Sequence, residues 1–184
     1  MSDHAEFYAY GVGRRDVESV MRLQAVKRWH MIDTTRIQTL AEHSANVGIL
    51  CFMLAYKAPH MFFGPACYAA MHGLLHDMGE VFTGDVPTPT KQKIDGLDDL
   101  EHAVLPAIFH KCVPSTLALL TKMCDLADGI RFIRLHGVDV TGAHARTGLE
   151  SQLLVKKEQA RKEWPPEVFD YVLDQLGFYA YEGS

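Results

Sequence analysis

Apolar residues recur at intervals of three and four along most of the chain, which is the period of an α-helix with one buried face. Leu40, Val47, Cys51 and Leu54 show the pattern clearly. No convincing alternating run is found, so we predict an all-α bundle without strands. Helices are expected at 16–27, 39–57, 65–77, 98–112, 115–136, 142–163 and 165–177, with Gly and Pro residues between them.

The stretch from Phe62 to Leu75 is apolar on nearly all sides, which predicts a helix buried in the middle of the bundle. With 184 residues, the chain is long enough for one domain with a substantial core and short for two. It contains no repeat, low-complexity tract or long linker that would divide it. We therefore predict a single domain spanning residues 1–184.

The composition is that of a folded globular protein, with 48% hydrophobic and 22% charged residues. The net charge of −5 disfavours a polymeric DNA or RNA partner, which requires a broad positive surface. Any phosphate must be held locally by a few cations or a metal, which favours a small ligand. The sequence has no signal-peptide pattern and no apolar run of about 18 residues. We therefore expect a cytoplasmic protein without a membrane partner.

A histidine and a carboxylate come directly after the long apolar segment. His76 and Asp77 follow Leu75, and Gly79 and Glu80 come shortly after them. A buried carboxylate is unfavourable unless it is paired, hydrogen-bonded or bound to a cation. A metal ion at a helix end near Gly79 would satisfy His76 and Asp77 together.

Two further polar positions lie inside predicted helices. His43 shares the inward stripe of its helix with Leu40, although a lone inward histidine is more often a hydrogen-bonded core residue. Asp125 lies in an apolar helical stretch with Asp128 one turn further on. We expect one of the two aspartates to point inward and favour Asp125; partial solvation or an internal salt bridge explains a lone aspartate equally well. Together, two histidines and two aspartates predict a site for one divalent transition ion, namely Zn, Co, Mn or Fe.

The order of these residues is the signature of the HD superfamily, and the resemblance extends beyond the ligands. The chain resembles the bacterial 5'-deoxynucleotidase branch and its viral relatives over about residues 20 to 135. The elements that carry the likeness are Arg28-Trp29, Glu42-His43-Ser44, His76-Asp77-x-x-Glu80, Thr83-Gly84-Asp85-x-Pro87-Thr88-Pro89-x-Lys91, and Asp125. This resemblance implies an HD-type helical bundle with its metal site between central helices.

The resemblance also implies chemical roles for individual residues. Glu80 would position or deprotonate the attacking water, and Asp85 would support the same chemistry or the leaving oxygen. Glu80 alone could also be read as a solvent-facing residue. The implied metal ligands are His43, His76, Asp77 and Asp125.

Arg28 and Trp29 are the first candidate substrate-binding residues along the chain. Arg28 would grip phosphate with its forked donor set, although alone it would be read as a surface salt bridge. Trp29 would pack against the sugar and favour deoxyribose, although alone it would be read as core. Met31 would lie against the edge of the base.

Two lysines bear on how many phosphates the substrate carries. Lys91 follows the loop that contains Pro89, which is itself a candidate substrate-binding residue, and Lys122 lies three residues before Asp125. With Arg28 and the metal, these lysines could bind more than one phosphate group. A triphosphate could also carry its own Mg²⁺. Each lysine alone is typical of a solvated surface.

Three functions from two classes fit these residues. We favour the dATP triphosphohydrolase of viruses that replace adenine with diaminopurine, because the short chain and the compact interval from Glu80 to Asp125 resemble that enzyme. In that case the cytoplasm is that of the host. The alternative is a 5'-deoxynucleotidase acting on deoxynucleoside monophosphates. A non-catalytic nucleotide sensor is remote, because neither a ligand nor Glu80 has been lost. Family resemblance implies a homo-oligomer, a dimer or hexamer, and the aromatic run at 178–181 is a candidate docking segment.

Overall fold

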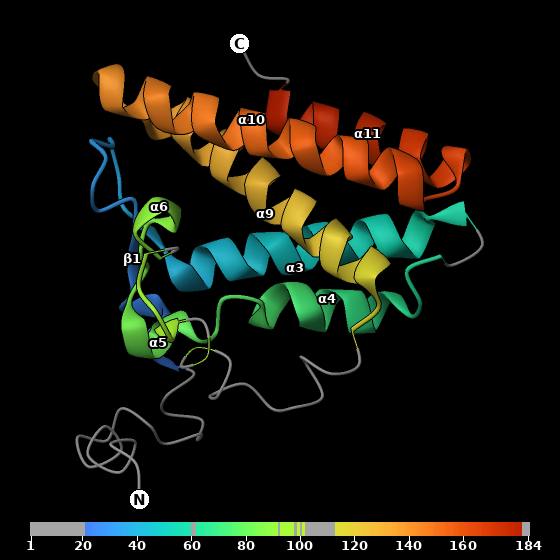
Figure 1. Cartoon of the computed structure of the whole chain (residues 1–184), viewed down its shortest axis with the longest axis horizontal. Helices are drawn as coiled ribbons and strands as arrows, with labels where there is room; N and C mark the ends of the chain where they lie inside the picture. The colour runs from blue at the N-terminus through green and yellow to red at the C-terminus, as the bar shows by residue number, and fades with distance from the viewer. Residues whose placement is uncertain are drawn as a thin grey trace, which may run out of the picture.

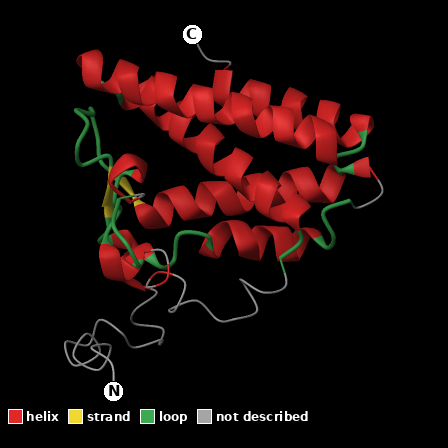
Figure 2. Cartoon of the chain, viewed as in Figure 1, coloured by secondary structure: helices red, strands yellow, loops and turns green. Residues whose placement is uncertain are grey.

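Helices form most of the structure, a computed structural model that describes residues 21–59, 62–91, 93–97, 99, 101 and 113–181 (Figure 1, Figure 2). The predicted all-α class is confirmed. In chain order, the helices are α3 (Leu40–Lys57), α4 (Ala66–Leu75), α5 (Glu80–Thr83), α6 (Thr88–Lys91), α9 (Ser115–His136), α10 (Asp139–Glu163) and α11 (Pro166–Tyr181). The helix predicted at 98–112 lies largely outside the described residues.

A short antiparallel ladder precedes the first long helix and corrects the expectation of no strands. Strand β1 (Lys27–Arg28) pairs with β2 (Gln38–Thr39), and Arg28 lies opposite Gln38. The helix predicted at 16–27 is wrong in its described part, where the 3-10 turn η1 (Arg22–Gln24) leads into β1. Two-residue strands are too short to leave an alternating pattern. The two strands pair because the chain reverses direction between β1 and β2.

Helices α3 and α4 pack closely because glycines face each other at their contact. A Cβ atom on Gly73 would lie 2.9 Å from the Cα of Gly48, so a larger residue has no room there. The start of α3 is fixed by Thr39, whose hydroxyl accepts the backbone N–H of Glu42. Helix α4 ends at Leu75, two residues earlier than predicted. The two helices run so that the start of α3 lies beside the end of α4 (Figure 1).

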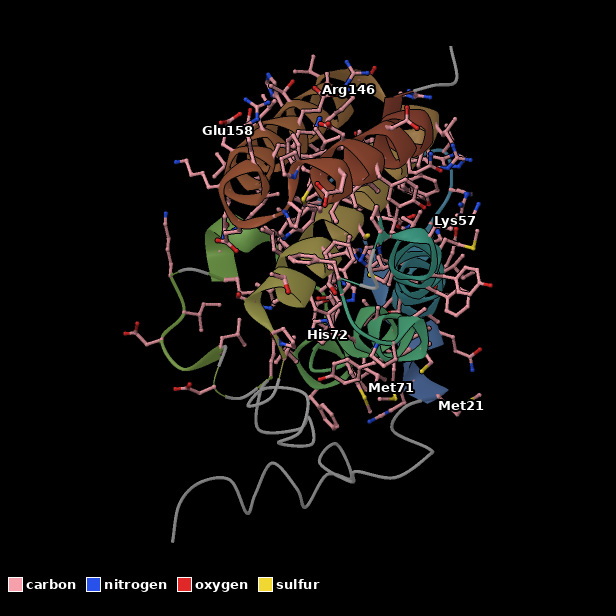
Figure 3. All side chains as sticks on the ribbon, turned by 90° about the vertical axis from the view of Figure 1, so that its right-hand side faces the viewer. Met21, Lys57, Met71, His72, Arg146 and Glu158 are labelled. Carbon is pink, nitrogen blue, oxygen red and sulfur yellow. The ribbon has the colours of Figure 1, made fainter. Side chains whose placement is uncertain are left out.

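Helix α4 lies at the surface, so the expectation of a helix buried in the middle is wrong. Met71 and Leu74 are 41% and 42% exposed. Figure 3 shows Met71 on the outer side of α4 and His72 on the side toward α9, where the His72 ring lies 2.7 Å from the Thr121 hydroxyl. The described helices cover α4 on one face, and its other face keeps exposed apolar side chains.

Helix α9 is the central element, lying between the α3–α4 pair and the α10–α11 pair (Figure 1). Its length agrees with the prediction at 115–136. Helix α10 begins earlier than predicted and includes Gly142, and α11 continues to Tyr181. The core that surrounds α9 includes Leu117, Leu120, Met123, Ile130, Leu153 and Leu176. No helix within the described residues combines the length and apolar character needed to cross a bilayer.

Candidate active site

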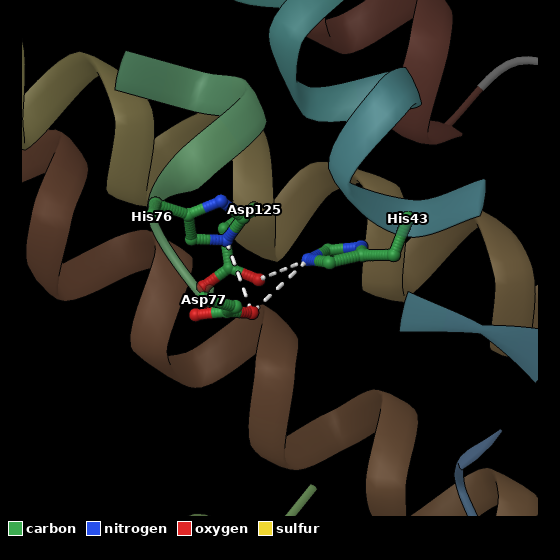
Figure 4. A group of neighbouring side chains, drawn as sticks. All are labelled: His43, His76, Asp77 and Asp125. Carbon is green, nitrogen blue, oxygen red and sulfur yellow. Dashed lines mark ion pairs between the residues drawn. The ribbon is translucent and has the colours of Figure 1, made fainter. Parts of the chain in front are cut away.

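The four residues predicted as metal ligands meet at one point (Figure 4). His43 comes from the first turn of α3, His76 and Asp77 from the turn after α4, and Asp125 from the middle of α9. One ligand atom from each residue lies within 4.8 Å of all the others. The Nε2 atom of His43 is 3.2 Å from Asp125 Oδ1 and 3.6 Å from Asp77 Oδ2. The Nε2 atom of His76 is 3.1 Å from the same Asp77 oxygen.

Both imidazoles are oriented by hydrogen bonds on the side away from the cluster. The Nδ1 atom of His76 lies 2.8 Å from the Gly73 carbonyl oxygen. That oxygen can only accept, so Nδ1 carries the proton. The Nδ1 atom of His43 lies 2.7 Å from Asp128 Oδ2. Both Nε2 atoms are buried and have no hydrogen-bond partner within the described part of the chain. Histidine ligands are commonly held in this way, and the mixed nitrogen and oxygen donors fit a divalent transition ion.

Asp128 is a site residue that the sequence reasoning missed. We expected one of Asp125 and Asp128 to point inward, and the structure buries both, at 8% and 2% exposure. Asp128 accepts hydrogen bonds from Gln38, His43, Asn46 and Tyr179. Four donors make a buried carboxylate favourable. The spacing of three residues, which places both aspartates on one helix face, was the available signal.

Tyr179 also takes part in this network. It belongs to the aromatic run at 178–181, whose role as a docking segment for a partner subunit stays a prediction. The Tyr179 hydroxyl donates to Asp128 Oδ1 at 2.8 Å within the same chain. Helix α11 therefore contacts Asp128, the carboxylate that binds the Nδ1 side of the His43 ring.

The negative charge of the cluster suits a bound cation. Burial and the charge of Arg28 lower the pKa of His43, but its ion pairs with Asp125, Asp128 and Asp77 raise that pKa to about 10. The three carboxylates therefore hold a proton on His43 at neutral pH. A divalent ion among the same atoms would supply positive charge in place of that proton.

Glu80 lies beside the cluster without belonging to it. It is 6% exposed, and its Oε2 atom has no hydrogen-bond partner among the described residues. Burial, followed by the charges of Asp77 and Asp85, raises the pKa of Glu80 to about 9. A divalent cation nearby would lower this pKa and leave a carboxylate able to accept a proton. This environment is typical of a catalytic acid or base.

A cavity of about 790 Å³ opens from the cluster. Its lining includes five of the six predicted substrate-binding residues, namely Arg28, Trp29, Met31, Lys91 and Lys122. The side chain of the sixth, Pro89, lies outside the described residues, and its backbone lies in α6. Met31 is 72% exposed and therefore contributes from the rim of the cavity.

The cations of the cavity are paired with carboxylates. Arg28 Nη1 lies 3.4 Å from Asp77 Oδ2, and Lys122 Nζ lies 2.6 Å from Asp125 Oδ2. Lys91 pairs with Glu101 and lies 3.7 Å from Glu80 Oε1. All three positive groups thus border the candidate ligands or the candidate base. A phosphate at the cluster would lie within their reach.

Asp85 also lines the cavity, where it contacts the backbone of Trp29. Its Oδ2 atom accepts the Trp29 N–H at 3.3 Å. This contact connects the loop after α5 with the end of β1. The predicted role of Asp85 in the chemistry stays a prediction. The observed contact holds the backbone of Trp29, whose side chain forms one wall of the cavity (the Trp29 wall).

The far wall of the cavity was not predicted. It is formed by α10, with Thr141, His144, Gly148 and Gln152 among the lining residues. These positions recur at three- and four-residue intervals and face the cavity together. Polar residues on a helix otherwise rich in charge gave no signal of a site. Only the packing of α10 on α9 brings this face to the histidine–aspartate cluster.

Comparisons with known proteins agree with this geometry. Residues 17–114 match the family model described as 5'-deoxynucleotidase YfbR-like. The dATP triphosphohydrolase of Cyanophage S-2L is 32% identical over 85% of this chain and 86% of its own length. The 5'-deoxynucleotidase YfbR of Salmonella arizonae is 36% identical over 38% of this chain and 36% of its own. The solved structure of the Cyanophage S-2L HD phosphohydrolase DatZ, bound to dA and one catalytic Zn²⁺ ion, covers 91% of this chain and 98% of that one, with a TM-score of 0.75 and 25% identity.

The helical bundle and its histidine–aspartate cluster define an HD-type, metal-dependent phosphohydrolase. The family model matches more than half of the chain, so the family within this class of enzymes can also be stated. This chain belongs to the YfbR-like 5'-deoxynucleotidase family.

Proposed function

We propose that this enzyme hydrolyses dATP to deoxyadenosine and triphosphate. The observation that carries the proposal is the cavity of about 790 Å³ that joins the metal cluster to Arg28, Lys91 and Lys122. Three cations around one cavity suit a triphosphate, which carries more negative charge than a monophosphate. Relatives named dATP triphosphohydrolase, from Cyanophage S-2L and Acinetobacter phage SH-Ab 15497, are each 32% identical to this chain.

The proposed ligands of the catalytic ion are His43, His76, Asp77 and Asp125. The ion is Zn, Co, Mn or Fe, and Zn²⁺ is favoured because the DatZ structure contains it. A bound divalent ion would supply Lewis acidity toward water and a phosphoryl oxygen. Mg²⁺ would accompany the triphosphate.

Glu80 is the proposed base. Its carboxylate accepts a proton from the water that attacks the phosphorus bonded to the 5'-oxygen. The water oxygen bonds to that phosphorus while the bond between the phosphorus and the 5'-oxygen breaks. Deoxyadenosine is the leaving group, and the proton that its 5'-oxygen takes up balances the one that Glu80 accepts. The triphosphate is released with the water oxygen on its α-phosphorus. Arg28 and the two lysines stabilise the negative charge that develops on the phosphoryl oxygens. Asp85 supports this arrangement by holding the Trp29 backbone.

Trp29 is the proposed wall for deoxyribose, and Met31 and Pro89 are proposed to contact the base. Met31 stands at the rim of the cavity, where it would meet the base edge that distinguishes adenine from its 2-amino analogue. Met31→Gly should change the ratio of kcat/KM for dATP and for 2-amino-dATP. An unchanged ratio would reject this role for Met31.

Hydrolysis of deoxynucleoside monophosphates is the second candidate function. The match of residues 17–114 to the 5'-deoxynucleotidase family favours it, as does the pairing of each cavity cation with a carboxylate. Purified protein should be incubated separately with dAMP and with dATP, and the products identified by ion-exchange chromatography. Triphosphate from dATP supports the first proposal, and phosphate from dAMP alone supports the second.

Chelation provides the control for both candidates. Removal of the ion should abolish turnover, and Zn²⁺ or Mn²⁺ should restore it. Full activity after complete chelation would reject a metal-dependent reaction at this site. Turnover of neither substrate in the metal-loaded enzyme would favour the nucleotide-sensor alternative.

A homo-oligomer is proposed from the exposed apolar faces of α3 and α4. Tyr56 and Ile49 on α3 are 69% and 62% exposed, and Met71 and Leu74 extend this surface on α4. Contiguous exposed apolar residues mark contact surfaces. We also propose that residues 1–184 act as one domain, in the cytoplasm where deoxynucleotides are found.

A further inference from the structure

We propose that Gln38 is a positioning residue that fixes the Trp29 wall of the nucleotide cavity to the carboxylate behind the metal site. Its amide bridges two groups that both matter for the site. The indole Nε1–H of Trp29 donates to Gln38 Oε1 at 2.7 Å, and Gln38 Nε2 donates to Asp128 Oδ2 at 2.9 Å. The same Asp128 oxygen holds the His43 ring. A continuous hydrogen-bonded chain therefore runs from the cavity wall to a candidate ligand.

The burial of Gln38 shows that this bridge is specific. Gln38 is 1% exposed, among the most buried polar residues described. A buried amide needs partners for both its oxygen and its nitrogen. Trp29 satisfies the oxygen and Asp128 the nitrogen, so neither contact can be lost without leaving a buried polar group unpaired.

The backbone of Trp29 explains why its side chain needs to be held. Trp29 has a φ of 62°, in the left-handed region that bulky residues rarely adopt. Such a conformation persists where surrounding contacts impose it, and it is often found at functional sites. The contacts are the Asp85 carboxylate on the backbone N–H, the ring of Phe132 stacked at 6.3 Å, and Gln38 on the indole.

The short ladder places Gln38 for this task. Gln38 lies opposite Arg28 in the β1–β2 pair, so it is next to the start of the Trp29 loop. It also precedes α3, whose first turn carries His43. Gly129 on α9 lies against the other side of this arrangement, because a Cβ there would be 3.4 Å from the Trp29 ring, at van der Waals contact. The ladder thus joins the indole wall and the ligand helix within a few residues.

This inference rests on the proposed function for its kinetic consequence. If Trp29 excludes the 2'-hydroxyl, its position sets the discrimination between dATP and ATP. Gln38→Leu removes both amide contacts while keeping a similar volume. We expect the ratio of kcat/KM for dATP over ATP to fall about tenfold, the effect of one lost hydrogen bond. The KM for dATP should rise.

Asn46→Leu is the matched control. Asn46 donates to Asp128 Oδ1 at 2.9 Å, a bond of the same length to the other oxygen of the same carboxylate, and it does not line the cavity. Any weakening of Asp128 is therefore shared by both variants. The selectivity ratio should stay at the wild-type value in Asn46→Leu. An equal fall in both variants, or no fall in Gln38→Leu, overturns the proposal.

A second measurement does not depend on activity. The chain has two tryptophans, and Trp164→Phe leaves Trp29 as the only source of indole fluorescence. In that background, Gln38→Leu should increase acrylamide quenching of Trp29, and Asn46→Leu should not. Equal quenching in the two variants contradicts the proposal. If the wild type hydrolyses no nucleotide, the proposed function fails, and the quenching comparison still decides the role of Gln38.

Discussion

Replacing Asp128 by Asn tests whether the carboxylate behind His43 prepares the metal site. Asp128 is 2% exposed and accepts four hydrogen bonds at 2.7–2.9 Å. Asparagine has the same size but one acceptor oxygen, so its amide nitrogen must face donors. Placed against His43, that nitrogen favours the tautomer with a proton on Nε2, where a metal should bind. Removal of such a partner lowers metal affinity about 10- to 100-fold.

Stability should fall as well, because at least one buried donor loses its acceptor. This loss amounts to about 2 kcal/mol, or roughly 4–8 °C in Tm for a chain of this size. Zn²⁺ affinity can be measured by competition with a chromogenic chelator, and Tm by circular dichroism of the metal-free protein.

The control for this experiment is Thr121→Val, also on α9. Thr121 is 3% exposed and its hydroxyl bonds to the His72 ring, away from the ligand atoms. This variant should have a lower Tm than the wild type and the same affinity for Zn²⁺. Wild-type affinity in Asp128→Asn would refute the reasoning, because it would reduce Asp128 to a structural residue.

Three further predictions concern the base, a surface histidine and the oligomer. Glu80→Gln should lower kcat by about 10²- to 10⁴-fold with unchanged Zn²⁺ affinity; near-normal kcat would exclude Glu80 as the base. Burial and the Arg36 charge lower the pKa of His136 below 6.5, so the unfolded chain binds this proton first and stability falls as pH drops from 6.5 toward the folded pKa. Melting curves between about pH 7.5 and 5.5 should therefore show a shallower pH dependence for His136→Gln than for the wild type, and equal slopes would contradict this assignment. Replacing the stacked Phe52 and Tyr56 on α3 by Ser should yield smaller species in light scattering, and an unchanged mass would exclude this face.

Several elements of the site could be predicted because their signals are local. The period of apolar residues predicted α3 and α9 with accurate ends, since each helix buries one face along its whole length. His43 and Asp125 were recognisable as charged or polar residues on those inward faces. The turn at Gly79 indicated where His76 and Asp77 could approach one ion.

The rest depends on contacts between distant segments. Gln38, His43 and Asn46 reach Asp128 across 90, 85 and 82 residues, and no local pattern encodes such partners. The α10 wall of the cavity arises in the same way, from packing on α9. The exposed face of α4 shows the converse, since apolar composition predicts burial without saying what covers the surface.

The sequence by itself determined the helical class and the identity of the candidate metal ligands, because helix period and ligand chemistry are properties of residue type and spacing. Tertiary structure alone decided how those ligands are oriented. A histidine binds a metal more tightly when another group fixes the proton on its second nitrogen. For His43 that group is Asp128, which comes from a different part of the fold.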